Sequence, residues 1–119
     1  MQKKLSLQRD LKAYLWDVCL AADEIFKFTK DMSEEGYAAS SITHSAVERK
    51  FEIIGEALNL LSKLDPKTAA RIPELSKIVA FRNILIHGYA TVDHERVWAI
   101  TKDELLSLRE IVGTLFSEL

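Results

Sequence analysis

The chain has 119 residues, of which 48% are hydrophobic and 29% are charged, and its formal net charge is −2. This length suits one domain with one core, so we expect a single domain over residues 1–119. With four Gly and two Pro, the composition argues against a sheet-rich or disordered chain. The lone cysteine, Cys19, excludes an internal disulfide and fits a reducing, cytoplasmic compartment, and the lack of a long apolar run predicts no membrane span.

The first predicted helix runs from near Ser6, its expected N-cap, to about Lys30. Its apolar stripe recurs at helical spacing and comprises Leu7, Leu11, Tyr14, Leu15, Val18, Ala22 and Ile25. Trp16, Phe26 and Phe28 fall beside this stripe and widen the apolar surface. A wide intramolecular core and a contact with a second subunit explain these aromatic residues equally well.

Residues 31–39 are acidic and poor in apolar side chains, so we expect a solvated, mobile loop that Tyr37 anchors to the domain. The second predicted helix runs from Ser41 to Lys63 and has two apolar stripes, one of Val47, Phe51, Ile54, Leu58 and Leu61 and one of Ile42, Ala46, Ile53 and Leu60. Two stripes indicate a helix contacted from two sides, as at the centre of a bundle. Gly55 in its middle predicts a close crossing by the next long helix or by that helix of a second subunit.

A short helical turn is predicted at Asp65-Pro66, with the aspartate as N-cap and the proline at the first helical position. A longer helix then opens at Pro73 and ends at Gly88, because glycine readily takes the left-handed conformation that closes helices. Asp93 is the predicted N-cap of one last helix, whose core face comprises Val97, Ile100, Leu105, Leu108, Ile111, Val112, Leu115 and Leu119.

The end of the helix that opens at Pro73 gathers four chemically useful side chains within residues 82–89. Arg82 carries a planar, permanently charged fork that matches phosphate, and His87 titrates near neutrality. Asn83 is suited to hold a base edge or a phosphate oxygen, and Tyr89 to stack or to hydrogen-bond. Because RNA carries its own nucleophile, the ribose 2′-hydroxyl, an enzyme that cleaves it needs a base, an acid and a cation, without a metal or another cofactor.

Arg82 and His87 are five positions apart, which places them about 140° apart around a straight helix. They can therefore meet on one ligand only if the helix loosens near His87 or if a second chain completes the site. Singly, each residue also has a common structural role: Arg82 as a surface charge, His87 as a partner of the helix dipole, and Asn83 as a buried polar group.

Together, the residues Arg82, Asn83, His87 and Tyr89 resemble the signature of HepT-like ribonuclease toxins, which belong to the HEPN superfamily of small helical RNA-binding and RNA-cleaving domains. Three further stretches of the chain are similar to helices of that family, namely residues 9–25, 48–57 and 97–98. The resemblance thus covers nearly the whole chain, from about Arg9 to Ile111.

This resemblance implies that Arg82 and His87 are catalytic and that Asn83 supports them. It implies an RNA substrate and a toxin–antitoxin pair, in which the antitoxin is a minimal nucleotidyltransferase of the MntA type. That partner would silence the toxin by adding AMP to Tyr89, since a bulky anionic group two residues from His87 would block the groove and repel RNA.

Other polar residues have two interpretations each. Arg49, Glu52 and Glu56 share one helix face, where they can orient Arg82 or His87 or form a surface row of weak ion pairs. We favour the surface interpretation for Glu52 and leave Arg49 and Glu56 open. His94 is a candidate second imidazole, although an exposed residue in a first helical turn is the more common case.

Charge is unevenly distributed along the chain. Residues 67–102 hold six Lys or Arg against three Asp or Glu, which gives +3 there and −5 for the remainder. Positive charge around the motif favours phosphate binding, although ordinary scatter explains such a window nearly as well.

We therefore expect an all-α, up-and-down four-helix bundle of the HEPN type, with a short extra helical turn before the motif helix. We also expect a homodimer in which two Arg82 and two His87 line one cleft. Two rival functions are a non-catalytic HEPN module that binds nucleotide or RNA for a nucleotidyltransferase partner, and a plain helical dimerisation domain.

Overall fold

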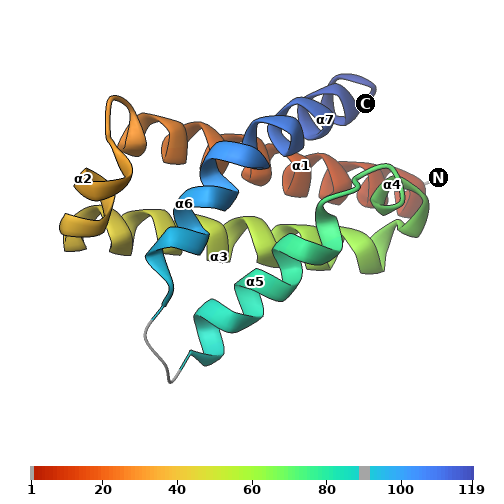
Figure 1. The fold of residues 1–119 in the computed structure, drawn as a ribbon. Coiled ribbons are helices and arrows are strands. Elements are labelled where there is room, and N and C mark those ends of the chain that lie inside the picture. Colours follow the sequence, from red (N-terminus) through yellow and green to blue (C-terminus); the bar gives the residue numbers. More distant parts are fainter. Residues whose placement is uncertain (1, 89–91) are drawn as a thin grey trace.

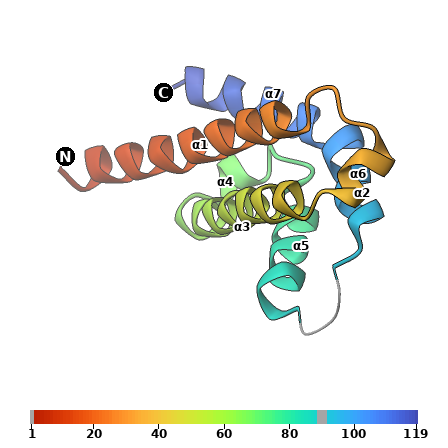
Figure 2. The same ribbon diagram turned by 90° about the vertical axis from the view of Figure 1, so that its left-hand side faces the viewer.

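The computed structural model describes residues 2–88 and 92–119, with side chains from residue 5 onward, and these residues form helices and no strand (Figure 1). The helices are α1 (Gln2–Thr29), α2 (Glu34–Ala39), α3 (Ser41–Leu64), α4 (Pro66–Ala69), α5 (Leu75–His87), α6 (His94–Asp103) and α7 (Leu105–Ser117). The two long helices, α1 and α3, run antiparallel, with α5 packed on α3 and α7 packed on α1 (Figure 2). The predicted all-α bundle is confirmed. Helices α6 and α7 together take the place of the fourth predicted helix. None of the helices described is both long and apolar enough to span a membrane.

The core lies where α1, α3, α5 and α7 meet. Its largest fully buried side chains include Phe51 of α3 and Phe81 of α5, whose rings meet edge-on with centroids 5.4 Å apart. Burying each such side chain contributes roughly 1.5–3 kcal/mol relative to leaving it exposed. This contact holds the motif helix α5 against α3. Cys19 is a small buried residue of the same core.

Helix α1 begins earlier than expected, and the predicted loop after it contains a helix. Ser6 lies inside α1 and is not its N-cap, because the residues before it favour helix. The short helix α2 is capped by Ser33, whose hydroxyl accepts the backbone N–H of Gly36 at 3.0 Å. The prediction that Tyr37 anchors this segment is confirmed, since its side chain is 1% exposed.

The helix ends around the motif were predicted in part. Helix α3 starts at the predicted Ser41, and α4 has its predicted cap, Asp65, which accepts the N–H of Thr68 at 3.2 Å. Pro73 lies before α5 and is not its first residue. Gly88 ends α5, but its φ of −69° is ordinary backbone, so the left-handed closure was wrong.

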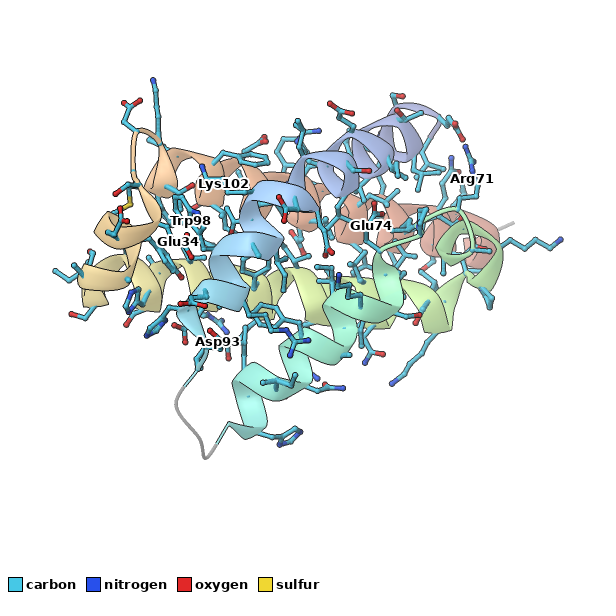
Figure 3. The ribbon with its side chains drawn as sticks, in the orientation of Figure 1. Glu34, Arg71, Glu74, Asp93, Trp98 and Lys102 are labelled. Carbon is cyan, nitrogen blue, oxygen red and sulfur yellow. The ribbon has the colours of Figure 1, made fainter. Side chains whose placement is uncertain are left out.

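The predicted single last helix is two helices, α6 and α7, separated at Glu104. Asp93 caps α6 as predicted, accepting the N–H of Glu95 at 3.1 Å (Figure 3). Because α6 packs on α2 while α7 packs on α1, one straight helix could not serve both neighbours. Glu104, which lies between α6 and α7, forms an ion pair with Lys77 of the motif helix α5.

Candidate active site

The motif helix crosses α3 at a glycine. At Gly55 an added Cβ would lie 2.6 Å from Cγ of Arg82 and closer still to its Cβ, so only a residue without a side chain fits there. The crossing predicted from Gly55 is therefore confirmed, and it occurs within one subunit. As a result, the stem of Arg82 lies directly on the backbone of α3 and its position is fixed by the packing of two helices.

The guanidinium of Arg82 is held by two partners. Its Nη2 donates to the Glu56 carboxylate in a short ion pair, and its Nη1 donates to Oδ1 of Asn83 at 3.0 Å. The Arg82 side chain is 22% exposed and that of Glu56 is 45% exposed. Because an arginine has five N–H donors, two such bonds leave donors free for an anion. Glu56 and Asn83 are thus both contacts of Arg82.

An open hollow of about 270 Å³ lies beside Arg82. Its walls come from three helices and comprise Tyr14, Asp17, Arg49, Glu52, Ile53, Glu56, Ala57, Leu60, Arg82 and Ile86. Arg49 adds a second positive charge to the wall, while Asp17, Glu52 and Glu56 are acidic. Arg49 and Glu52 therefore line the same hollow as Arg82.

His87 does not line this hollow. It is the last residue of α5, exposed to solvent, and its imidazole has no hydrogen bond to any side chain within the described ranges. Arg82 and His87 thus point to different sides of α5, as a straight helix requires. The structure of one subunit does not bring the two predicted catalytic residues together. Tyr89, the predicted modification site, lies outside the described residues.

Apolar side chains are exposed around the hollow and on the same two helices. Leu60 and Ile86 in its wall are 36% and 40% exposed, while Ile42 of α3 and Ile84 of α5 are 84% and 46% exposed. Exposed apolar residues in the wall of a hollow, here Leu60 and Ile86, are typical of a contact surface.

We compared the chain with models of known protein families. The model of the family described as ribonuclease HepT-like matches residues 18–115. The chain belongs to this family.

Relatives of this HepT-like chain carry ribonuclease names. A "Putative RNase" of Methanocaldococcus jannaschii is 32% identical over 105 residues, which is 88% of this chain and 95% of the relative. The "Probable ribonuclease HepT" of Thermococcus cleftensis is 35% identical over 106 residues, covering 87% of this chain and 93% of the relative. No solved structure matches the chain. The assignment to the HepT-like ribonuclease family, predicted from the motif and its neighbouring helices, is confirmed.

The HepT-like chain also has a histidine cluster that the sequence did not reveal. His44 of α3 and His94 of α6 stack with ring centroids 3.6 Å apart, and Tyr37 of α2 lies 4.9 Å from the His44 ring. His94 is partly exposed, at 32% of its side chain, and its ring also contacts His44 and Tyr37, so it is only in part the exposed first-turn residue expected. The signal was the i, i+4 spacing of His44 and Glu48, which puts both on one face of α3.

Glu48 is the acid of this cluster, with one carboxylate oxygen 3.9 Å from Nδ1 of His94. Burial raises the pKa of Glu48, an effect that the nearby imidazoles of His94 and His44 oppose. Burial likewise raises the pKa of the Tyr37 phenol above its ordinary value. In residues 2–88 and 92–119, no three His, Cys, Asp or Glu side chains are grouped so that they could hold a metal ion.

Proposed function

We propose that this HepT-like protein is the endoribonuclease toxin of a toxin–antitoxin pair and that it cleaves RNA without a metal ion, through Arg82 and His87. The observation that carries the proposal is the position of Arg82. It is held by Glu56 and Asn83, it packs on Gly55, and it lines an open hollow. A positioned guanidinium of this kind is suited to bind a phosphodiester and to stabilise the charge that develops on it.

In the proposed reaction, His87 removes the proton from the ribose 2′-hydroxyl. The 2′-oxygen then forms a bond to phosphorus while the bond from phosphorus to the 5′-oxygen breaks. Arg82 stabilises the negative charge on the phosphoryl oxygens, and an acid, for which a second His87 is the candidate, protonates the leaving 5′-oxygen. The products are a 2′,3′-cyclic phosphate and a 5′-hydroxyl.

This reaction needs a homodimer, because Arg82 and His87 of one subunit point apart. In this proposal the exposed apolar residues in the wall of the hollow, Leu60 and Ile86, are part of the surface that a second copy covers. Pairing two copies across this face would set Arg82 of one subunit opposite His87 of the other in one groove. The two subunits would then line a single RNA-binding cleft.

The antitoxin in this proposal is an MntA-like nucleotidyltransferase that transfers AMP from ATP to the phenol of Tyr89, releasing pyrophosphate. AMP attached two residues after His87 adds a phosphate beside the proposed groove, so it would repel the RNA backbone. Incubation with ATP and the partner should add the mass of one AMP to the wild-type chain and none to Tyr89→Phe.

The decisive experiment combines growth and cleavage. Expression of the protein alone should arrest growth, and co-expression of the nucleotidyltransferase should restore it. The purified protein should cleave RNA in the presence of EDTA, and Arg82→Ala and His87→Ala should lose cleavage while keeping the circular dichroism of the folded chain. Cleavage that persists in His87→Ala, or that EDTA abolishes, would refute the proposed mechanism.

A further inference from the structure

A second and larger hollow lies on the other side of α1, between α1 and α7. Its volume is about 470 Å³, and the lining residues that matter here are Leu5, Arg9, Lys12, Trp16, Phe116 and Leu119. We call it the α1–α7 groove. Tyr14 lines the candidate active site and Trp16 lines this groove, and residues two positions apart lie about 200° apart around a helix. The two hollows share no lining residue, so the groove is not part of the proposed catalytic site.

The groove exposes large apolar side chains next to one another. Leu5 is 66% exposed and Trp16 is 54% exposed. The Trp16 ring leans on that of Phe116, with centroids 5.6 Å apart and planes at 42°. A half-exposed tryptophan beside a second aromatic ring in a hollow is typical of the anchor point of a protein interface.

The charged side chains that line the groove are both positive, although the whole chain has a net charge of −2. They are Arg9 and Lys12, one turn apart on α1. Nζ of Lys12 lies over the Phe116 ring, 5.3 Å from its centroid, so the positive charge is next to the aromatic wall. A ligand that fits this groove therefore has an apolar centre and negative charge beside it.

We propose that the α1–α7 groove binds a helical segment of a partner protein, which inserts a bulky apolar side chain against Trp16 and Phe116 and sets acidic side chains beside Arg9 and Lys12. Aliphatic walls from Leu5 and Leu119 favour protein side chains over stacked nucleobases, since single-stranded RNA sites are built on open aromatic faces along a positive strip. Because the groove lies apart from Arg82, the bound segment holds its protein on this subunit while the candidate active site stays open.

The test uses a displayed library of helical peptides with one randomised face. Panning on the wild-type chain should enrich peptides with a Leu, Phe or Trp flanked by Asp or Glu, and the enriched peptide should shift the indole N–H resonance of Trp16 in NMR spectra. The resonance of Trp98 serves as an internal reference, because Trp98 lies on α6 under Lys102, far along the molecule from the groove (Figure 3).

Charge reversal supplies the matched control. The double variant Arg9→Glu, Lys12→Glu should weaken binding of the enriched peptide at least tenfold. The double variant Lys27→Glu, Lys30→Glu changes two exposed lysines at the C-terminal end of α1, away from the groove. It should bind the enriched peptide as the wild type does.

Three results would overturn the proposal. One is enrichment of peptides without acidic residues, and another is equal binding by the two double variants. The third is a Trp16 shift by oligouridine that Arg9→Glu, Lys12→Glu abolishes, which would make the groove a nucleic-acid site. RNA cleavage by Arg9→Glu, Lys12→Glu should stay at the wild-type rate, so a failure here is distinguishable from a failure of the proposed ribonuclease activity.

Discussion

The position of the Arg82 side chain is fixed by contacts within the protein itself. Its stem packs on Gly55, and its guanidinium is shared between Glu56 and Asn83. An arginine so constrained loses little rotamer freedom when it binds phosphate, and its free donors keep a fixed direction. Glu56 therefore acts in this account as a positioning residue, which orients Arg82 without touching the RNA.

Replacing Glu56 by Gln should slow RNA cleavage while the chain stays folded. Gln keeps an acceptor for Arg82 but loses the charge, and we expect kcat to fall roughly tenfold, with Glu56→Ala lower still, because misplacement of an orienting group costs up to about a hundredfold. Glu52→Gln removes a charge from the same rim without removing a partner of Arg82, and it should keep most of the activity. If the two glutamine variants lose activity equally, the loss reflects rim charge and not the position of Arg82.

Glu48 should make the free energy of unfolding fall as the pH rises, whereas a carboxylate with a lowered pKa makes it rise. Because burial raises its pKa in the folded chain, the folded state binds more protons than the unfolded state between the ordinary and the raised value, and stability falls as the pH rises through that window. Glu48→Gln removes this penalty, so its melting temperature should exceed that of the wild type at pH 7, and the difference should shrink toward about pH 4.

Glu110→Gln controls for the loss of one negative charge, since Glu110 is an exposed residue of α7. Lower stability of Glu48→Gln than of the wild type at pH 7 would mean that the contact of the carboxylate with His94 outweighs its desolvation.

At the scale of helices, the crossing of α3 and α5 determines where Arg82 lies. Two long apolar stripes and a central glycine were enough to predict that crossing from the sequence, because close helix approach has a simple steric requirement. The extra helix α2 was missed because its cap, Ser33, and its anchor, Tyr37, lie in a stretch whose acidic composition resembles a loop. The break at Glu104 has no Gly or Pro to signal it, and it follows from packing on two different partners.

Gly55→Ala should destabilise the fold and displace the motif helix. The new Cβ would meet the stem of Arg82, and overpacking of this kind costs about 1–3 kcal/mol in the free energy of unfolding. Gly113→Ala is the matched control in α7, because there the new Cβ would meet only Nη1 at the far end of the Arg109 side chain, 2.6 Å away, and this end can shift by loosening its exposed ion pair with Asp23. In a helix interior that change should stabilise by up to about 1 kcal/mol. Urea denaturation of both variants measures the difference, and equal effects would contradict the close crossing.

On the scale of the whole molecule, one subunit holds an incomplete site. The positions of Arg82 and His87 on different sides of α5 follow from their spacing in the sequence, since both residues lie within the one helix. What the sequence could not place were the partners of Arg82 and the stacked histidines, because these depend on how α3 meets α5 and α6. The family could be predicted from the sequence because the motif residues lie within one short stretch and further stretches resemble the family's other helices.

Leu60→Glu should prevent dimerisation and cleavage together. A carboxylate in the middle of the proposed subunit contact would lose its contact with water there, which opposes dimerisation. In a single subunit residue 60 is exposed, so the carboxylate stays in water and the chain should stay folded. Leu106→Glu is the control, since Leu106 is 57% exposed on α7, and it should remain a dimer. Light scattering after size-exclusion chromatography reports the mass. A dimeric, active Leu60→Glu protein would place the contact elsewhere.

The shared site itself is tested by mixing two inactive proteins. Arg82→Ala and His87→Ala subunits should each fail to cleave RNA alone. In a mixed dimer an intact Arg82 of one subunit faces the intact His87 of the other, which supplies the base, while water replaces the missing second His87 as the acid. We predict that unfolding and refolding the two variants together restores metal-independent cleavage to a measurable fraction of the wild-type rate. If native mass spectrometry confirms mixed dimers and cleavage stays at the level of the separate variants, Arg82 and His87 do not meet across the subunit boundary and the account is wrong.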